Sequence, residues 1–337
     1  MNAVPAEQNL VSVIMPVYNR LSWIEEALQS VRKQTWPHWE VILCDDGSDE
    51  QTASFLDRLA DSNRVRVLHL PHCGPGPARE AGRQAARGEY IQYLDSDDLL
   101  HSEKFEKQIV ALREHPDCGI AYGRTRLIDE DGNVLEESYK RIQERAGLFP
   151  GLLVDRWWCT HTPLYRHELC DRIGPWSDLR YSQDWEYDAR AGALKTKLVF
   201  ADHVVSDHRD HNDSQRQTGK GRWLDPIDQI RFFQSLYVCS QDAGVAVGVP
   251  EMRHFVRWVF ASARAAGRAG DPDSAKKLLA LAVQADDGRS VGPRIYGSVS
   301  RLLGWRIPDL FIEGVRRVLG RKSGSFTLQQ SWMDDDD

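Results

Sequence analysis

The side chains best suited to chemistry are the carboxylates that end an apolar stretch at residues 88–98, GEYIQYLDSDD. Asp95 and Asp97 are two positions apart, and alternate residues of an extended chain point to the same side. Two such carboxylates repel each other unless a cation lies beside them, and Mg²⁺ and Mn²⁺ prefer oxygen ligands. Carboxylates also cap helices, and a helix is expected from about Ser102. The pair therefore predicts either a divalent-cation site or a capped, solvated turn.

Two earlier apolar runs, VSVIM and EVILC, also lead into residues that could bind a ligand. The first is followed by Pro16, Tyr18 and Asn19, and the second by Asp45 and Asp46. Ligands of open α/β sheets bind beyond the carboxyl ends of the strands, so we expect these side chains to meet at one edge. The two aspartates could instead form only an Asx-turn with the Gly-Ser that follows.

The elements that position these residues follow from hydrophobic periodicity. Between the apolar runs, apolar residues recur every three or four positions, as in helices that pack on a sheet. Strand and helix alternate with short connections, which predicts an α/β fold with a mostly parallel sheet and helices on both faces. The sequence has no G-x-G-x-x-G between the first strand and helix, which argues against the usual dinucleotide site.

Composition narrows the function further. A net charge of −7 argues against a nucleic-acid partner, because no overall positive field would attract phosphates. Six scattered cysteines without CxxC spacing favour free thiols in a reducing cytoplasm. No secretory signal and no apolar run of about 20 residues is present, so we expect a cytoplasmic protein, either soluble or peripheral to the membrane.

The patterns divide the chain into four expected parts. These are an N-terminal tail (1–10), the α/β domain (11–222), a C-terminal helical region (223–322) and an acidic tail (323–337). Residues 289–322 carry eight Arg or Lys and two acids among apolar residues. Such a basic amphipathic segment could contact the inner face of a membrane or pack on its own domain.

Four motifs occur in order between residues 10 and 215: VSVIMPVYNR, QTWPHWEVILCDDGS, GPGPAREAGRQAARGEY and YLDSDD. Together they resemble the inverting family 2 glycosyltransferases, which have the GT-A fold. The resemblance implies a nucleotide-sugar donor held by the polar residues at the strand ends. It also implies that a bound Mn²⁺ or Mg²⁺ contacts the D-x-D acids.

Carried over residue by residue, the resemblance assigns donor-binding roles. Pro16, Tyr18 and Asn19 are expected to line the base and ribose, and Asp46 to accept a hydrogen bond from the base. Asp95 and Asp97 become the metal-binding acids, with Asp97 the direct ligand. Arg79 belongs to the donor-binding helix, although the family often has Arg-Asn where this chain has Arg79-Glu80.

Inverting transfer needs a base that takes the proton of the acceptor hydroxyl. The family typically has Glu-Asp at the start of a helix, where this chain has Gln183-Asp184. Asp184 is therefore the expected base, and Glu186 is the reserve candidate. A carboxylate at a helix N-terminus could instead be a cap or a partner of the helix dipole.

Two further segments could contact substrates. Trp157 and Trp158 could stack on acceptor sugars or fill the core. The histidine-rich segment 203–214 resembles the family's loop over the diphosphate, where Arg209 or His211 could bind phosphate or metal. A solvated polar loop is the alternative. Zinc is disfavoured there, because the sequence shows neither a neighbouring cysteine nor an H-x-x-x-H helix.

These expectations combine into a metal-dependent inverting glycosyltransferase. It would move a sugar from a nucleotide-diphosphate sugar, by default a UDP-sugar, to a glycan or lipid-linked acceptor in cell-surface polysaccharide synthesis. Two alternatives remain. A nucleotidyltransferase would need a glycine-rich basic loop after the first strand, and a non-catalytic carbohydrate-binding or scaffold protein of the same fold would be expected to have lost the acids.

Overall fold

The computed structural model describes residues 6–61, 63–211, 225–287 and 291–305. The chain divides into two compact units, Met1–Ala246 and Val247–Asp337. The division falls later than the expected boundary at residue 222. The reason is helix α7 (Pro226–Asp242), which packs against α6 (Gln183–Ala193) within the first unit. Its helical periodicity alone could not show which unit it joins.

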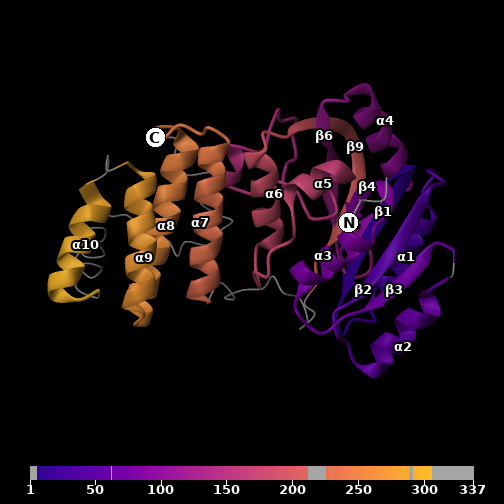
Figure 1. Ribbon diagram of the computed structural model, residues 1–337, viewed down its shortest axis with the longest axis horizontal. Helices are drawn as coiled ribbons and strands as arrows, with labels where there is room; N and C mark the ends of the chain where they lie inside the picture. Colours follow the sequence, from indigo (N-terminus) through magenta and orange to yellow (C-terminus); the bar gives the residue numbers. More distant parts are fainter. Residues whose placement is uncertain (1–5, 62, 212–224, 288–290, 306–337) are drawn as a thin grey trace. The chain divides into compact units, whose positions relative to one another are not determined.

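The first unit is built on a nine-stranded mixed sheet (Figure 1). Eight strands follow the order β3-β2-β1-β4-β8-β6-β9-β5, and β7 pairs with β6. The strands are β1 (Glu7–Val17), β2 (Trp39–Asp45), β3 (Val65–His69), β4 (Gly88–Tyr93), β5 (Leu99–Leu100), β6 (Cys118–Ile128), β7 (Val134–Tyr139), β8 (Leu164–Arg166) and β9 (Lys197–Arg209).

The prediction of a mostly parallel sheet is confirmed for one half of this sheet. Strands β3, β2, β1 and β4 are all parallel, as alternating strands and helices require. Beyond β4, strand β8 is antiparallel to both its neighbours, and β5 and β7 are also antiparallel to their partners. Strand β1 begins at Glu7, so part of the expected N-terminal tail is strand.

Helices cover the two faces of the sheet. They are α1 (Ile24–Arg32), α2 (Glu50–Leu59), α3 (Pro75–Ala85), α4 (Lys104–Glu114), α5 (His167–Ile173) and α6, with a 3₁₀ turn at Gly151–Leu153. Alternate residues of β1 serve opposite faces. Val13 and Met15 belong to the core that includes residues of α1 and α4. Ile14 instead meets α3, where a Cβ on Gly82 would lie 2.4 Å from its Cγ2. Glycine therefore lets α3 lie directly on the sheet.

The second unit is helical in its described part. Helix α9 (Pro272–Ala285) packs against both α8 (Pro250–Ala269) and α10 (Val291–Leu303). Helix α9 is capped at its start, because the Asp271 carboxylate accepts a hydrogen bond from the Ser274 amide at 3.0 Å. None of the helices in the described ranges has the length and apolar character needed to cross a membrane.

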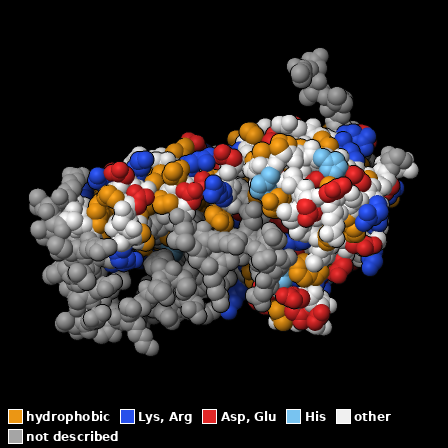
Figure 2. All heavy atoms as spheres, turned by 90° about the horizontal axis from the view of Figure 1, so that it is seen from below, with side chains coloured by type: hydrophobic (Ala, Val, Ile, Leu, Met, Phe, Trp, Pro, Cys, Tyr) orange, Lys and Arg blue, Asp and Glu red, His pale blue; other side chains and the backbone are white. Residues whose placement is uncertain are grey.

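The predicted basic segment 289–322 is described only in part. Within α10, Tyr296 is buried and a Cβ on Gly297 would lie 2.8 Å from Leu279 of α9. One side of α10 thus packs on its own unit. The rest of the segment and the acidic tail at 323–337 lie outside the described residues, and membrane contact stays a prediction. On the face shown in Figure 2, Lys and Arg side chains are interspersed with Asp and Glu.

Candidate active site

A cavity of about 190 Å³ opens where the strands of the parallel half end. Seven of the residues chosen from the sequence line it: Pro16, Tyr18, Asp46, Arg79, Asp95, Asp97 and Asp184. They come from the ends of β1, β2 and β4 and from the first turns or interior of α3 and α6. The predicted convergence on one sheet edge is therefore what the structure shows.

The Asp97 carboxylate, which lines the cavity, contacts an arginine and a histidine. Its Oδ2 lies 2.5 Å from Arg20 Nη1 and 2.9 Å from His211 Nε2. Burial would raise the pKa of Asp97, but the hydrogen bond from His211 and the charge of Arg20 outweigh it and lower the pKa. The group is held as an anion, which is the form that binds a cation.

These residues also fit a divalent cation. Arg20 Nη1 and His211 Nε2 converge on one oxygen of Asp97, which is ionised and could bind a cation. Asp95 is 31% exposed at the same cavity, and the His211 imidazole supplies a nitrogen ligand. Helix α4 begins only at Lys104, after the short strand β5, so the D-x-D acids do not cap it. This observation removes the helix-cap alternative for the pair.

Arg79 lines the cavity and has hydrogen-bond donors without a partner among the described residues. Its Nη2 lies 2.5 Å from Asp95 Oδ1, and its guanidinium stacks 5.0 Å above the Trp176 ring. Its Nε and Nη1 are buried and have no hydrogen-bond partner among the described residues. Unpaired buried donors are costly, so this arginine is suited to receive an anionic ligand. The unusual neighbour Glu80 pairs with Arg83 on the same helix.

Asp184 lies in the first turn of α6, after Ser182, which has a left-handed φ of 57°. Its Oδ2 accepts hydrogen bonds from Arg156 Nη1 at 2.7 Å and Thr160 Oγ1 at 3.1 Å. Burial would raise the pKa of Asp184, but the charges of Arg156 and Arg79 outweigh it and lower the pKa. The residue at the N-cap position is Ser182, so Asp184 is not the cap. It is an oriented, ionised carboxylate at the cavity.

Comparison with known proteins agrees with this geometry. Residues 12–174 match the model of Glycosyl transferase family 2. This segment, just under half of the chain, belongs to the family. It is 36% identical over 130 residues to the "putative teichuronic acid biosynthesis glycosyltransferase TuaG" of Bacillus subtilis, a match that covers 38% of this chain and 51% of TuaG. It is also 36% identical over 141 residues to an "uncharacterized glycosyltransferase" of Rickettsia felis, covering 42% of this chain and 22% of that protein.

A solved structure shows the same fold over most of the chain. Residues 1–349 of S. aureus TarS, crystallised in complex with UDP-GlcNAc, superpose with a TM-score of 0.69 at 19% identity. The match covers 93% of each chain. The GT-A prediction is therefore confirmed. The chain matches only about half the length of TuaG and about a fifth of the length of the R. felis protein.

Within this family 2 domain, two predicted donor contacts are occupied differently. The Asp46 carboxylate accepts hydrogen bonds from the Cys73 amide at 2.7 Å and the Gly74 amide at 2.9 Å, which fixes the start of α3. Asn19 does not line the cavity, and its Oδ1 accepts from the Asp49 amide at 2.7 Å. Both side chains therefore accept hydrogen bonds from backbone amides at this edge of the sheet and hold the loops there in place.

The two residues predicted to contact the diphosphate, Arg209 and His211, differ in their surroundings. Arg209 is buried, does not line the cavity, and donates to the carbonyls of Asp97 at 3.1 Å and Glu130 at 2.7 Å. It braces the D-x-D backbone, so a direct phosphate contact is not what this structure shows. His211, in contrast, contacts the Asp97 carboxylate.

The acceptor candidates lie outside the cavity. Glu186 pairs with Arg190 at 2.8 Å and accepts from Ser235 Oγ at 2.9 Å, so it faces α7. Trp157 and Trp158 are 4% and 1% exposed and fill the core. The core-filling alternative holds for the tryptophans, and Glu186 loses its place as reserve base.

The buried position of Trp158 gives a stability prediction. We expect Trp158→Ala to lower the free energy of unfolding by about 3–5 kcal/mol, because it removes a buried indole and the hydrogen bond from its Nε1 to Asp188. Urea unfolding measures this change. If Trp158→Ala unfolds with the free energy of the wild type but no longer transfers sugar, Trp158 binds the acceptor and does not serve only to fill the core.

Several cavity residues were missed in the sequence. They are Arg20, Thr160, Arg180 and His208. Arg156 was also missed; it does not line the cavity but donates a hydrogen bond to Asp184, which does. Arg20 ends the VYNR motif and could have been chosen as the next residue of that loop. Arg156 gave no local signal, because its partner lies 28 residues away.

Proposed function

We propose that the protein is an inverting glycosyltransferase that uses a nucleotide-diphosphate sugar, most simply a UDP-sugar, and a Mn²⁺ or Mg²⁺ ion. One observation carries the proposal. A single cavity combines the D-x-D carboxylates and the unpaired donors of Arg79 with an ionised Asp184 contributed by a different element. The TarS fragment of the same fold was crystallised with UDP and with UDP-GlcNAc, which supports the choice of nucleotide.

The donor half of the mechanism follows from the charges. A cation held by Asp97, with Asp95 and His211, would neutralise the charge that develops on the leaving diphosphate. Arg79 would donate its Nε and Nη1 hydrogens to phosphate oxygens. Arg209 keeps the Asp97 backbone in place through its contact with the carbonyl.

The acceptor half rests on Asp184. Its carboxylate would accept the proton of the acceptor hydroxyl while that oxygen attacks the anomeric carbon opposite the diphosphate. Arg156 and Thr160 hold one oxygen of the carboxylate, and this fixes its direction. Attack from the face opposite the leaving group inverts the anomeric centre.

The acceptor that we propose is a glycan or lipid-linked glycan in cell-surface polysaccharide synthesis, at the cytoplasmic face of the membrane. The name of TuaG, which places that relative in teichuronic acid biosynthesis, supports this class. The first test is nucleotide release from UDP-, GDP- and dTDP-sugars in the presence of Mn²⁺. Release from one class is expected, and release from none with a folded sample would contradict the proposal.

Arg79 offers a test of the diphosphate contact. We expect Arg79→Ala to weaken UDP binding about 10- to 100-fold, because hydrogen bonds to charged groups contribute roughly 1.5–3 kcal/mol. Calorimetry with UDP and Mn²⁺ measures it. Arg83→Ala, on the same helix but outside the cavity, is the matched control and should bind UDP as the wild type does.

A further inference from the structure

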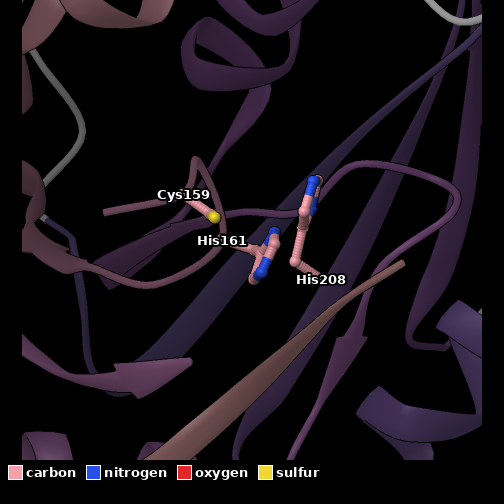
Figure 3. A group of neighbouring side chains, drawn as sticks. All are labelled: Cys159, His161 and His208. Atoms are coloured by element: carbon pink, nitrogen blue, oxygen red, sulfur yellow. The ribbon is translucent and has the colours of Figure 1, made fainter. Parts of the chain in front are cut away.

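A second group of potential metal ligands lies beside the D-x-D acids. Cys159 and His161 belong to the segment before β8, and His208 lies on β9 (Figure 3). The Cys159 sulfur and one nitrogen of each imidazole all lie within 4.8 Å of one another. Cys159 and His161 are buried, and His208 is partly buried. In Figure 3 the three side chains, which come from two separate segments, lie next to one another, and the two imidazole rings are roughly parallel.

The Asp98 carboxylate contacts both imidazoles of this cluster. Its Oδ2 lies 2.7 Å from His161 Nδ1, and its Oδ1 lies 3.0 Å from His208 Nδ1. Metal-binding histidines commonly carry such a carboxylate on the nitrogen that does not bind the metal, which fixes the orientation of the ring. Asp98 is itself buried, and its two histidine contacts hold its carboxylate in one orientation.

His161 supplies an independent sign that a ligand belongs here. Its side chain is 0% exposed, and neither ring nitrogen makes a well-directed hydrogen bond in the described part of the chain, although Nδ1 lies 2.7 Å from the Asp98 carboxylate. A buried polar atom without a partner is costly, and such atoms are rare in folded proteins. With Nδ1 directed at Asp98, Nε2 is the atom left to bind a ligand.

The kind of ion follows from the donor atoms. Sulfur and imidazole nitrogen are the ligands of Zn²⁺, whereas Mg²⁺ and Mn²⁺ prefer oxygen. We propose that Cys159, His161 and His208 bind a zinc ion, with Asp98 orienting the two imidazoles. The sequence argued against zinc near residues 203–214, since no cysteine lies there. The fold supplies Cys159 from a segment about 50 residues earlier.

Such an ion would join three parts of the domain at the wall of the cavity: the segment before β8, strand β9, and the D-x-D stretch through Asp98. Zinc binding would therefore stabilise the fold. This site is chemically separate from the proposed manganese or magnesium site at Asp97 and does not depend on the proposed reaction.

Zinc content tests the proposal directly. The full chain is incubated with Zn²⁺, passed through a desalting column and analysed by mass spectrometry for bound metal. We expect one zinc per chain in the wild type and about tenfold or greater loss of affinity in Cys159→Ser and His161→Gln. Cys118→Ser is the matched control, because Cys118 and Cys159 are both 7% exposed, and it should retain zinc. Asp97→Ala should also retain it, which separates the two metal sites.

Cobalt gives a second measurement that needs no variant. Co²⁺ in the wild-type site should show the absorption of a thiolate–cobalt bond, and this absorption should be absent in Cys159→Ser. Far-UV circular dichroism checks that each sample is folded. Folded wild-type protein that holds no zinc and shows no thiolate–cobalt absorption would overturn the proposal, as would unchanged zinc affinity in Cys159→Ser.

Discussion

Asp97→Ala is expected to abolish the Mn²⁺ dependence of nucleotide binding and to weaken UDP binding in Mn²⁺ by about 100-fold. The carboxylate is the point where Arg20 and His211 converge, and it is the direct metal ligand that the D-x-D motif predicts. Without it, the charge of the diphosphate lacks its main counter-charge. Calorimetry with UDP, with and without Mn²⁺, measures both effects.

The control for this variant is Asp202→Ala, because Asp202 is 72% exposed, lies outside the cavity and pairs with Arg124, which is 41% exposed. It should bind UDP as the wild type does. The unfolding midpoint of Asp97→Ala must also be compared with that of the wild type, since the change leaves Arg20 and His211 without this partner. Unaltered Mn²⁺-dependent binding in Asp97→Ala would remove the D-x-D acids from the proposed mechanism.

Asp184→Asn is expected to lower the turnover number about 10²- to 10⁴-fold, the usual contribution of a general base. Asparagine has a similar shape and can still accept a hydrogen bond from Arg156, so UDP affinity should change little. Nucleotide release in the presence of acceptor measures turnover, and calorimetry measures the affinity. Transfer at the wild-type rate would show that another group takes the proton.

Glu186→Gln is the matched control for Asp184→Asn. Both residues are acids in the first turn of α6, but Glu186 pairs with Arg190 and Ser235 away from the cavity. Transfer should persist in this variant. The pH profile adds a further check, because Arg156 and Arg79 lower the pKa of Asp184. The base is then ionised throughout the neutral range, and its acidic limb should lie below about pH 4.

Much of the fold could be predicted from periodicity because the first four long strands and their helices are local units. Strand β2, nearly all of β4 and the second half of β1 are buried on both faces, and β1, β2 and β3 each lead into a helix within seven residues, so pattern and structure coincide. The region after β4 was harder. Strand β8 has three residues, Leu164–Arg166, and its antiparallel pairing with β4 depends on segments more than 70 residues apart.

In the candidate site, too, residues in local motifs could be predicted and contacts between distant segments could not. Asp95, Asp97 and Asp184 were recognisable because each follows a motif at the start or end of a local element. Arg156, which holds Asp184, left no pattern in the sequence. Asp98 ends the YLDSDD motif, but its two histidine partners come from distant segments and could not be predicted. Trp157 and Trp158 show the opposite case, because an aromatic pair has the same sequence pattern in a core and in a sugar-binding site.

The two alternative functions, a non-catalytic protein and a nucleotidyltransferase, require different residues at the nucleotide-binding cavity. A non-catalytic protein of this fold would have little reason to keep Asp97, Asp184 and the unpaired donors of Arg79 in one cavity. A nucleotidyltransferase would require a glycine-rich basic loop after β1, where this chain has Pro16-Val-Tyr-Asn. Both alternatives remain open to the nucleotide-release test described above.

The most direct measurement of the central claim is calorimetric titration of the wild-type chain with UDP, GDP and dTDP, each with and without Mn²⁺. We predict that one nucleotide, most simply UDP, binds tightly in Mn²⁺ and far more weakly without it, and that Asp97→Ala removes this difference. A folded wild-type sample that binds none of the three nucleotides, or binds one equally well without metal, would contradict a metal-dependent donor site at the D-x-D acids.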